Sequence, residues 1–215
     1  MVEAIISAVR QEKLIAIFRN IHLDQCMCVA QALYDGGIRL MELTYDQNAP
    51  ETWEQTATTV GALATKFAGR MYVGAGTVTS PELVELTYRH GGQFVVSPDV
   101  NEAVIQKTCQ LGLVSISGAM TPSEIMAAHR AGAHFVKVFP AGVLGAPYLK
   151  AVKAPASHVE LIAFGGIDEH NLPDFLQAGA CGAGIGVSLV NPHWVSAGEY
   201  GKIMQAAQRL VSLIK

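Results

Sequence analysis

The chain has 215 residues, of which half are hydrophobic and 15% are charged, a composition that excludes a disordered protein and suits one domain spanning residues 1–215. Its net charge of −3 leaves no basic surplus for binding nucleic acid or an anionic membrane surface. No stretch approaches the about 18–20 uncharged apolar residues of a membrane span, and the N-terminus does not resemble a signal peptide, so we expect a cytoplasmic protein.

Cysteine and histidine give no sign of a disulfide framework or a metal centre. The four cysteines form no CxxC motif, and Cys26 and Cys28 lie on an expected helix with their side chains on different faces. The seven histidines form no HxH or HExxH motif. We therefore expect free thiols, no metal site and no cofactor.

Short apolar runs rich in β-branched residues alternate with longer amphipathic segments along the chain. The eight runs are LIAIF at 14–18, IRLMELT at 38–44, RMYVGAG at 70–76, QFVVS at 93–97, LVSIS at 113–117, HFVKVF at 134–139, VELIAF at 159–164 and CGAGIG at 181–186. Each interval has room for a helix, and glycines follow the expected helix ends. The pattern predicts an α/β fold, a (β/α)8 TIM barrel with residues 2–12 as an extra N-terminal helix over its base. An open, doubly wound sheet is the alternative.

Side chains that can cap a helix N-terminus mark the starts of several expected helices. They are Asp24, Ser80, Asn101, Thr121 and Asp168. The segment Thr121-Pro122-Ser123-Glu124 adds a proline at the first helical position and the glutamate of a capping box.

One lysine stands inside an apolar strand. The chain has eight lysines, and Lys137 is the one that falls within an expected strand, where alternation places it on the same face as Phe135 and Phe139. Burial on that face would lower the pKa of the amine and leave it able to form a Schiff base with a carbonyl compound. The strand alone leaves two other roles open, an amine that extends to solvent and a buried ion pair.

Two further charged residues are expected near this lysine, because reactive groups of a TIM barrel lie at the C-terminal ends of its strands. Glu42 lies on the inward face of the second expected strand, where it can pair with Lys137 or transfer protons to and from a bound carbonyl compound. Arg19 follows the first expected strand. Its guanidinium can hold a substrate carboxylate through two hydrogen bonds, or it can lie exposed at the strand end.

Two glycine clusters follow the seventh and eighth expected strands, FGGID at 164–168 and GIGVS at 184–188. The loops at these places in a TIM barrel often bind phosphate through backbone N–H groups, and glycine lets the anion approach the backbone closely. The candidate phosphate ligands are Gly165, Gly166, Gly186 and Ser188. Tight turns are the alternative role for these glycines.

A family resemblance is carried by five segments: GGIRLMELT, VGAGTV, GGQFVVSPDVNEAVI, FVKVFPAGVLG and FGGIDEHNLPDFLQAG. Together they resemble the 2-keto-3-deoxy-6-phosphogluconate (KDPG) aldolases. The wider group includes the 4-hydroxy-2-oxoglutarate (KHG) and 2-dehydro-3-deoxy-6-phosphogalactonate (KDPGal) aldolases. The resemblance runs from about residue 13 to 190. It implies a class I, metal-free aldolase that is usually a homotrimer.

The resemblance also implies roles for individual residues. Lys137 matches the Schiff-base lysine, and Glu42 matches the glutamate that transfers protons. Thr77 and Pro98 match positions that line the pyruvate pocket. The positions that bind the phosphate match Gly165, Gly166 and Ser188.

Two positions depart from the gluconate-type pattern. Asp46, in Thr44-Tyr45-Asp46-Gln47, replaces the arginine with which those enzymes hold the substrate carboxylate, and Phe164 replaces a threonine. Ile17-Phe18-Arg19 and Phe164-Gly165-Gly166 look more like the phosphogalactonate branch, in which an arginine that ends the first strand serves the carboxylate. We therefore expect Arg19 to bind the substrate carboxylate.

These observations predict the reversible cleavage of a 2-keto-3-deoxy-6-phospho sugar acid, of phosphogluconate or phosphogalactonate type, to pyruvate and glyceraldehyde 3-phosphate. Three alternatives stay open: a KHG aldolase, a phosphosugar epimerase and a non-catalytic phosphosugar-binding protein on the same barrel. An epimerase does not need a lysine flanked by aromatic residues, and a binding protein does not need both Lys137 and Glu42.

Overall fold

The computed structural model describes residues 1–19, 21 and 23–215. Eight parallel strands pair in chain order and β8 pairs with β1, so the sheet closes into a barrel. The strands are β1 (Leu14–Phe18), β2 (Leu40–Thr44), β3 (Tyr72–Gly76), β4 (Phe94–Val96), β5 (Val114–Ala119), β6 (Phe135–Val138), β7 (Leu161–Phe164) and β8 (Gly182–Ile185). The prediction of a (β/α)8 TIM barrel is confirmed, and the open doubly wound sheet is wrong.

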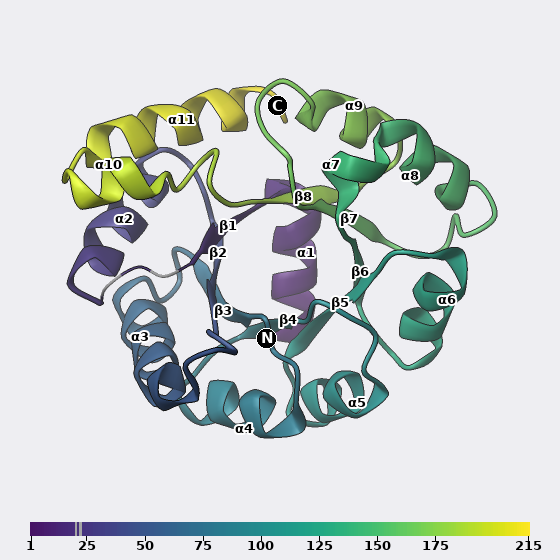
Figure 1. Cartoon of the computed structure of the whole chain (residues 1–215), viewed down its shortest axis with the longest axis horizontal. Helices are drawn as coiled ribbons and strands as arrows, with labels where there is room; N and C mark the ends of the chain where they lie inside the picture. The colour runs from purple at the N-terminus through teal and green to yellow at the C-terminus, as the bar shows by residue number, and fades with distance from the viewer. Residues whose placement is uncertain (20, 22) are drawn as a thin grey trace.

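The described helices form a ring around the barrel, except α1, which lies across one end of it (Figure 1). They are α1 (Val2–Glu12), α2 (Leu23–Asp35), α3 (Trp53–Lys66), α4 (Pro81–Arg89), α5 (Glu102–Gln110), α6 (Pro122–Arg130), α7 (Ala141–Leu144), α8 (Ala146–Lys153), α9 (Leu172–Gln177), α10 (Pro192–Ser196) and α11 (Tyr200–Ser212), with a 3-10 turn, η1, at Pro50–Thr52. Two βα units contain two helices each, α7 with α8 and α10 with α11. None of the described helices is both long and apolar enough to cross a membrane.

The expected helix boundaries agree with the structure in most places. Asn101 accepts hydrogen bonds from two backbone N–H groups of α5, and Thr121 forms the complete capping box of α6. Ser80 occupies the N-cap of α4 without a side-chain bond to the helix backbone. Asp168 accepts from the backbone just before α9 rather than capping it. The prediction that Asp24 caps α2 is wrong, because α2 begins at Leu23, one residue before Asp24. Asp24 therefore lies in the first turn of the helix, where its carboxylate interacts favourably with the helix dipole.

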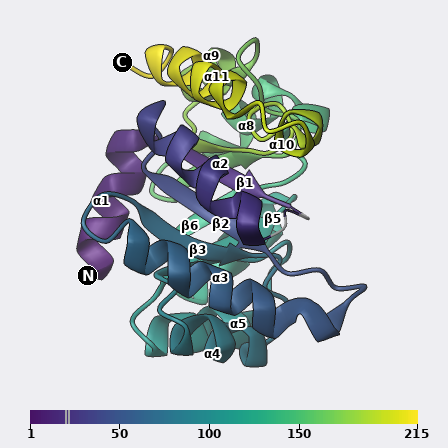
Figure 2. The ribbon, with the colours of Figure 1, turned by 90° about the vertical axis from the view of Figure 1, so that its left-hand side faces the viewer.

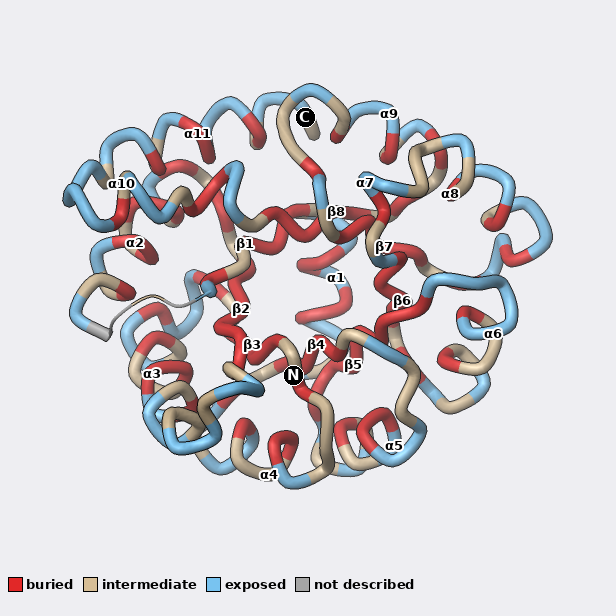
Figure 3. The backbone as a smooth tube through the Cα atoms, viewed as in Figure 1, coloured by how far each residue is buried: buried red, intermediate tan, exposed pale blue. Residues whose placement is uncertain are grey.

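The alternating side chains of the strands divide between two apolar cores. Met41 of β2 and Val136 of β6 face the helices and belong to the larger core. Phe135 of β6 and Phe164 of β7 belong to the core inside the barrel. Figure 3 shows the buried residues concentrated on the strands and on the inner faces of the helices. This division puts Lys137 on the inward face together with Phe135.

Helix α1 closes the N-terminal end of the barrel, as the sequence predicts for residues 2–12. Its side chains Ile5, Ile6 and Val9 belong to the same apolar cluster as the inward-facing Ile15 of β1. Figure 2 shows α1 at one end of the barrel and the connection between β2 and α3 projecting at the other. Because α1 fills the base, the C-terminal ends of the strands are the place where a site can open to solvent.

Candidate active site

A cavity of about 310 Å³ opens at the C-terminal ends of the strands and contains most of the predicted site residues. Its wall combines three charged side chains with the glycine-rich loops that follow β7 and β8. Seven of the nine predicted residues line it: Arg19, Glu42, Lys137, Gly165, Gly166, Gly186 and Ser188. Residues from the first, second, sixth, seventh and eighth βα units therefore meet in one place.

Thr77 and Pro98 are not part of this wall within the described chain. Thr77 follows β3 with a φ of 56°, a left-handed conformation that is uncommon for a β-branched residue. Pro98 follows β4, and its carbonyl oxygen fills the space where a Cβ on Gly118 would lie. Gly118 pairs with Lys137 in the sheet, so Pro98 stands two strands from the lysine. Contact of Thr77 and Pro98 with a substrate stays a prediction.

Lys137 is buried in the barrel, with 8% of its surface exposed. Its Nζ lies 4.9 Å from the centroid of the Phe164 ring and 5.1 Å from that of the Phe139 ring. Burial lowers the pKa of the amine, the charge of Glu42 raises it, and the charge of Arg19 lowers it further. The amine neither extends to solvent nor forms an ion pair within 4.0 Å with a described residue.

Glu42 faces the same cavity with a carboxyl group that is 2% exposed. Its Oε2 atom is buried and has no hydrogen-bond partner among the described residues. Burial raises the pKa of Glu42 to about 7, although the positive charges of Lys137 and Arg19 lower it. An unpartnered buried carboxyl group costs free energy in folding, and such groups concentrate at functional sites.

Glycines make room for the aromatic wall around the lysine. Gly184 faces the interior from β8, and a Cβ atom there would overlap the Phe164 ring. A Cβ atom on Gly165 would lie 2.9 Å from the Phe139 ring, and Gly165 has a φ of 84° that favours glycine. The two rings are therefore held next to Lys137 by positions that a larger residue would disturb.

The loops after β7 and β8 line the cavity and contain backbone N–H groups that are not used in hydrogen bonds within the described chain. Within the described chain, the N–H groups of Gly166, Gly186 and Ser188 donate to no acceptor. The hydroxyl of Ser188 donates to the carbonyl oxygen of Ile167 at 2.9 Å, which links the two loops. Free N–H groups in the loops at these places of a barrel suit a phosphate group.

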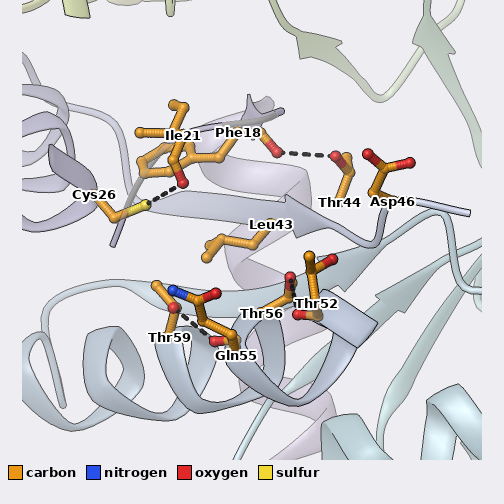
Figure 4. A pocket seen from close by; sticks show the side chains of 10 residues that line it. All are labelled: Phe18, Ile21, Cys26, Leu43, Thr44, Asp46, Thr52, Gln55, Thr56 and Thr59. Atoms are coloured by element: carbon orange, nitrogen blue, oxygen red, sulfur yellow. Dashed lines mark hydrogen bonds between the residues drawn. The ribbon is translucent and has the colours of Figure 1, made fainter. Parts of the chain in front are cut away.

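Asp46 lies away from this cavity. It lines a separate cavity of about 300 Å³ beside β2, together with Thr44 and residues of α3 (Figure 4). Its Oδ1 accepts a hydrogen bond from the backbone N–H of Asn48 at 2.9 Å, and its carbonyl oxygen accepts from the indole of Trp53 at 2.7 Å. Besides Lys137, the basic side chain on the wall of the candidate site is therefore Arg19.

Comparison with known proteins agrees with this geometry. The sequence model of the KDPG and KHG aldolases matches residues 5–206. The chain belongs to this aldolase family. Aldolases are lyases, so the chain is an enzyme of that class.

Relatives from Escherichia coli illustrate the similarity. The chain is 33% identical to 2-dehydro-3-deoxy-6-phosphogalactonate aldolase, covering 94% of this chain and 93% of the relative. It is 30% identical to KHG/KDPG aldolase, covering 88% of this chain and 86% of the relative. A solved structure described as native KDPGal superimposes with a TM-score of 0.83 at 33% identity, covering 93% of both chains.

The raised pKa of Glu42 predicts a pH-dependent stability. The unfolded carboxyl group loses its proton near 4.5 and the folded one near 7, so between these values the folded state binds more protons and stability falls as pH rises. Glu42→Gln removes this loss. In urea unfolding at constant protein concentration, the variant should gain stability relative to the wild type between pH 5 and pH 8. If the difference in unfolding free energy between the two proteins stays the same across this pH range, the raised pKa of Glu42 is contradicted.

Proposed function

We propose that the chain catalyses the reversible aldol cleavage of a 2-keto-3-deoxy-6-phospho sugar acid to pyruvate and glyceraldehyde 3-phosphate. The observation that carries the proposal is the buried amine of Lys137, which shares one cavity with the unpartnered carboxyl group of Glu42. A low-pKa amine suits Schiff-base formation, and a carboxyl group with a pKa near neutrality suits proton transfer.

In this mechanism the neutral amine of Lys137 attacks the C2 ketone of the substrate. Loss of water from the resulting carbinolamine leaves a positively charged iminium. The C3–C4 bond then breaks, and its electron pair moves toward the iminium nitrogen to give an enamine. Protonation of the enamine at C3 and addition of water release pyruvate and restore the free amine.

Glu42 serves the proton transfers on either side of bond cleavage. Its carboxylate takes the proton of the C4 hydroxyl, through a water molecule, as the C4 carbon becomes the aldehyde of glyceraldehyde 3-phosphate. It then returns a proton to C3 of the enamine. A pKa of about 7 suits both steps, because each protonation state is well populated near neutral pH.

The two anionic ends of the substrate have candidate partners in the cavity. Arg19 is proposed to hold the C1 carboxylate, and the free N–H groups of the two glycine loops are proposed to hold the phosphate. The phosphate ligands in this proposal are Gly165, Gly166, Gly186 and Ser188. Contacts with both ends would fix the C2 carbon against Lys137, so that binding energy helps the chemical step.

The phosphogalactonate epimer is proposed as the preferred substrate. Support comes from Arg19 at the end of β1, from Phe164 before the glycine pair, and from the position of Asp46 outside the cavity. The identity to the KDPGal relative also exceeds that to the KHG/KDPG relative, 33% against 30% over a similar part of the chain.

We propose further that the protein is a cytoplasmic homotrimer. Exposed apolar side chains near the mouth of the barrel support association, among them Val143, which is 84% exposed, and Met120 and Phe139. The four cysteines are all free thiols, in keeping with a reducing compartment.

The Schiff base itself can be trapped. Incubation with pyruvate and sodium borohydride should add one reduced pyruvyl group per chain at Lys137, located by peptide mass spectrometry. The Lys137→Met variant is the control and should take up no label. Labelling of a different lysine, or of none, would contradict the mechanism, as would loss of pyruvate release in EDTA.

A coupled assay of pyruvate release tests the choice of substrate. We expect a higher kcat/KM for the phosphogalactonate-type substrate than for the phosphogluconate-type substrate. Equal values, or the reverse order, would contradict the epimer preference. Release from 4-hydroxy-2-oxoglutarate but from neither phosphorylated acid would favour the KHG aldolase alternative.

Two variants separate the proposed carboxylate and phosphate sites. Arg19→Lys replaces a bidentate guanidinium with an ammonium, so part of a charge-assisted bond worth about 1.5–3 kcal/mol is lost. It should weaken both pyruvate trapping and turnover of the full substrate. Ser188→Leu should spare pyruvate trapping and raise KM for phosphorylated substrates only, because pyruvate has no phosphate. Unchanged trapping in Arg19→Lys would place the carboxylate elsewhere.

A further inference from the structure

The missing side chain of Gly76, at the end of β3, leaves a space that Glu42 occupies. A Cβ atom on Gly76 would lie 2.5 Å from Oε1 and 2.8 Å from Cδ of Glu42. It would also lie 3.1 Å from the methyl carbon Cγ2 of Thr44. All three atoms belong to β2, so the carboxyl group of Glu42 lies across the neighbouring strand, against the backbone of Gly76.

Backbone conformation does not explain the glycine at this position. Gly76 is not among the glycines with a positive φ, so an alanine could adopt its backbone angles. Gly74, on the same face of β3, also has no space for a side chain, because a Cβ atom there would overlap the carbonyl oxygen and the ring of Phe94. The Glu42 carboxyl group is therefore the group that a larger residue at position 76 would have to displace.

The direction in which a larger residue would move Glu42 follows from the sheet. Strand β2 lies between β1 and β3, and Glu42 pairs with Ile17 of β1. A methyl group on Gly76 would push the carboxyl group away from β3 and toward β1, where Arg19 lines the cavity. A carboxylate that moves closer to a guanidinium is held in its ionised form.

We infer that Gly76 is a positioning residue, whose missing Cβ keeps the Glu42 carboxyl group against β3, within reach of a substrate on Lys137 and out of an ion pair with Arg19. The inference rests on the proposed function, which assigns proton transfer to Glu42. Adding one methyl group to β3 should then separate two steps: Schiff-base formation, which needs Lys137, and proton transfer, which needs Glu42.

The Gly76→Ala variant tests this separation. At saturating pyruvate, borohydride trapping at Lys137 should change by less than about twofold, while kcat falls at least about tenfold, toward the about 10²–10⁴-fold that acid–base groups contribute. The acidic limb of the kcat/KM profile should also move to lower pH, because in the free enzyme Arg19 would hold the displaced carboxylate ionised. A merely structural effect would not move this limb.

Gly201→Ala is the matched control. Gly201 lies in α11, its φ is not positive, and a Cβ atom there would meet no atom within 4 Å. This variant should keep the wild-type kcat and pH profile. If Gly76→Ala instead lowers trapping and turnover equally and leaves the acidic limb in place, Gly76 has a structural role only and the inference is overturned.

A second comparison covers the case in which Gly76→Ala folds poorly. A Glu42→Ala background removes the two nearest atoms that the new methyl group would meet and leaves the methyl of Thr44, so the fall in Tm caused by Gly76→Ala should be smaller than in the wild type. An equal fall in both backgrounds overturns the inference. This measurement does not need activity: if the wild type releases no pyruvate, the proposed function fails while the contact is still tested.

Discussion

The burial of one amine in an apolar barrel is the constraint on which the site depends. The ring centroids of Phe139 and Phe164 lie 5.1 Å and 4.9 Å from the Nζ atom of Lys137, and no described residue forms an ion pair with it. The free-energy cost of burying the charged ammonium form is therefore left largely uncompensated, and this cost lowers the pKa of the amine. The same burial raises the pKa of Glu42, which brings an acid and an amine toward neutrality in one cavity.

The interior of a small eight-stranded barrel is normally filled by side chains, so a site inside it needs positions that carry none. Gly184 gives space to the ring of Phe164, and Gly76 gives space to the carboxyl group of Glu42. The apolar residues at the base, among them Ile15 and Phe135, keep the lower part of the barrel filled. The result is a packed base below a cavity with few, fixed polar groups.

The groups proposed to bind the anionic ends of the substrate differ in position and charge from Lys137 and Glu42 inside the barrel. Arg19 and the free N–H groups of the glycine loops lie on the rim, where solvent can reach the cavity, and they carry positive charge or partial positive charge. Lys137 and Glu42 lie deeper and are nearly fully buried. A substrate with charged ends and a central ketone matches this arrangement, because its ends would stay near water while its carbonyl carbon enters the apolar interior.

The sequence by itself determined the barrel, because eight apolar runs separated by helical segments and glycine turns leave few other ways to bury the strands. It also placed Glu42 on the inward face of its strand and Lys137 on the same face as Phe135, since strand alternation needs no tertiary information. Only the tertiary structure decided that Asp46 faces a different cavity, that Lys137 lacks an ion pair with a described residue, and that Gly76 receives the Glu42 carboxyl group. These features depend on distances between neighbouring strands and on the turn after β2, and contacts between residues far apart in the chain cannot be derived from the local pattern of one strand.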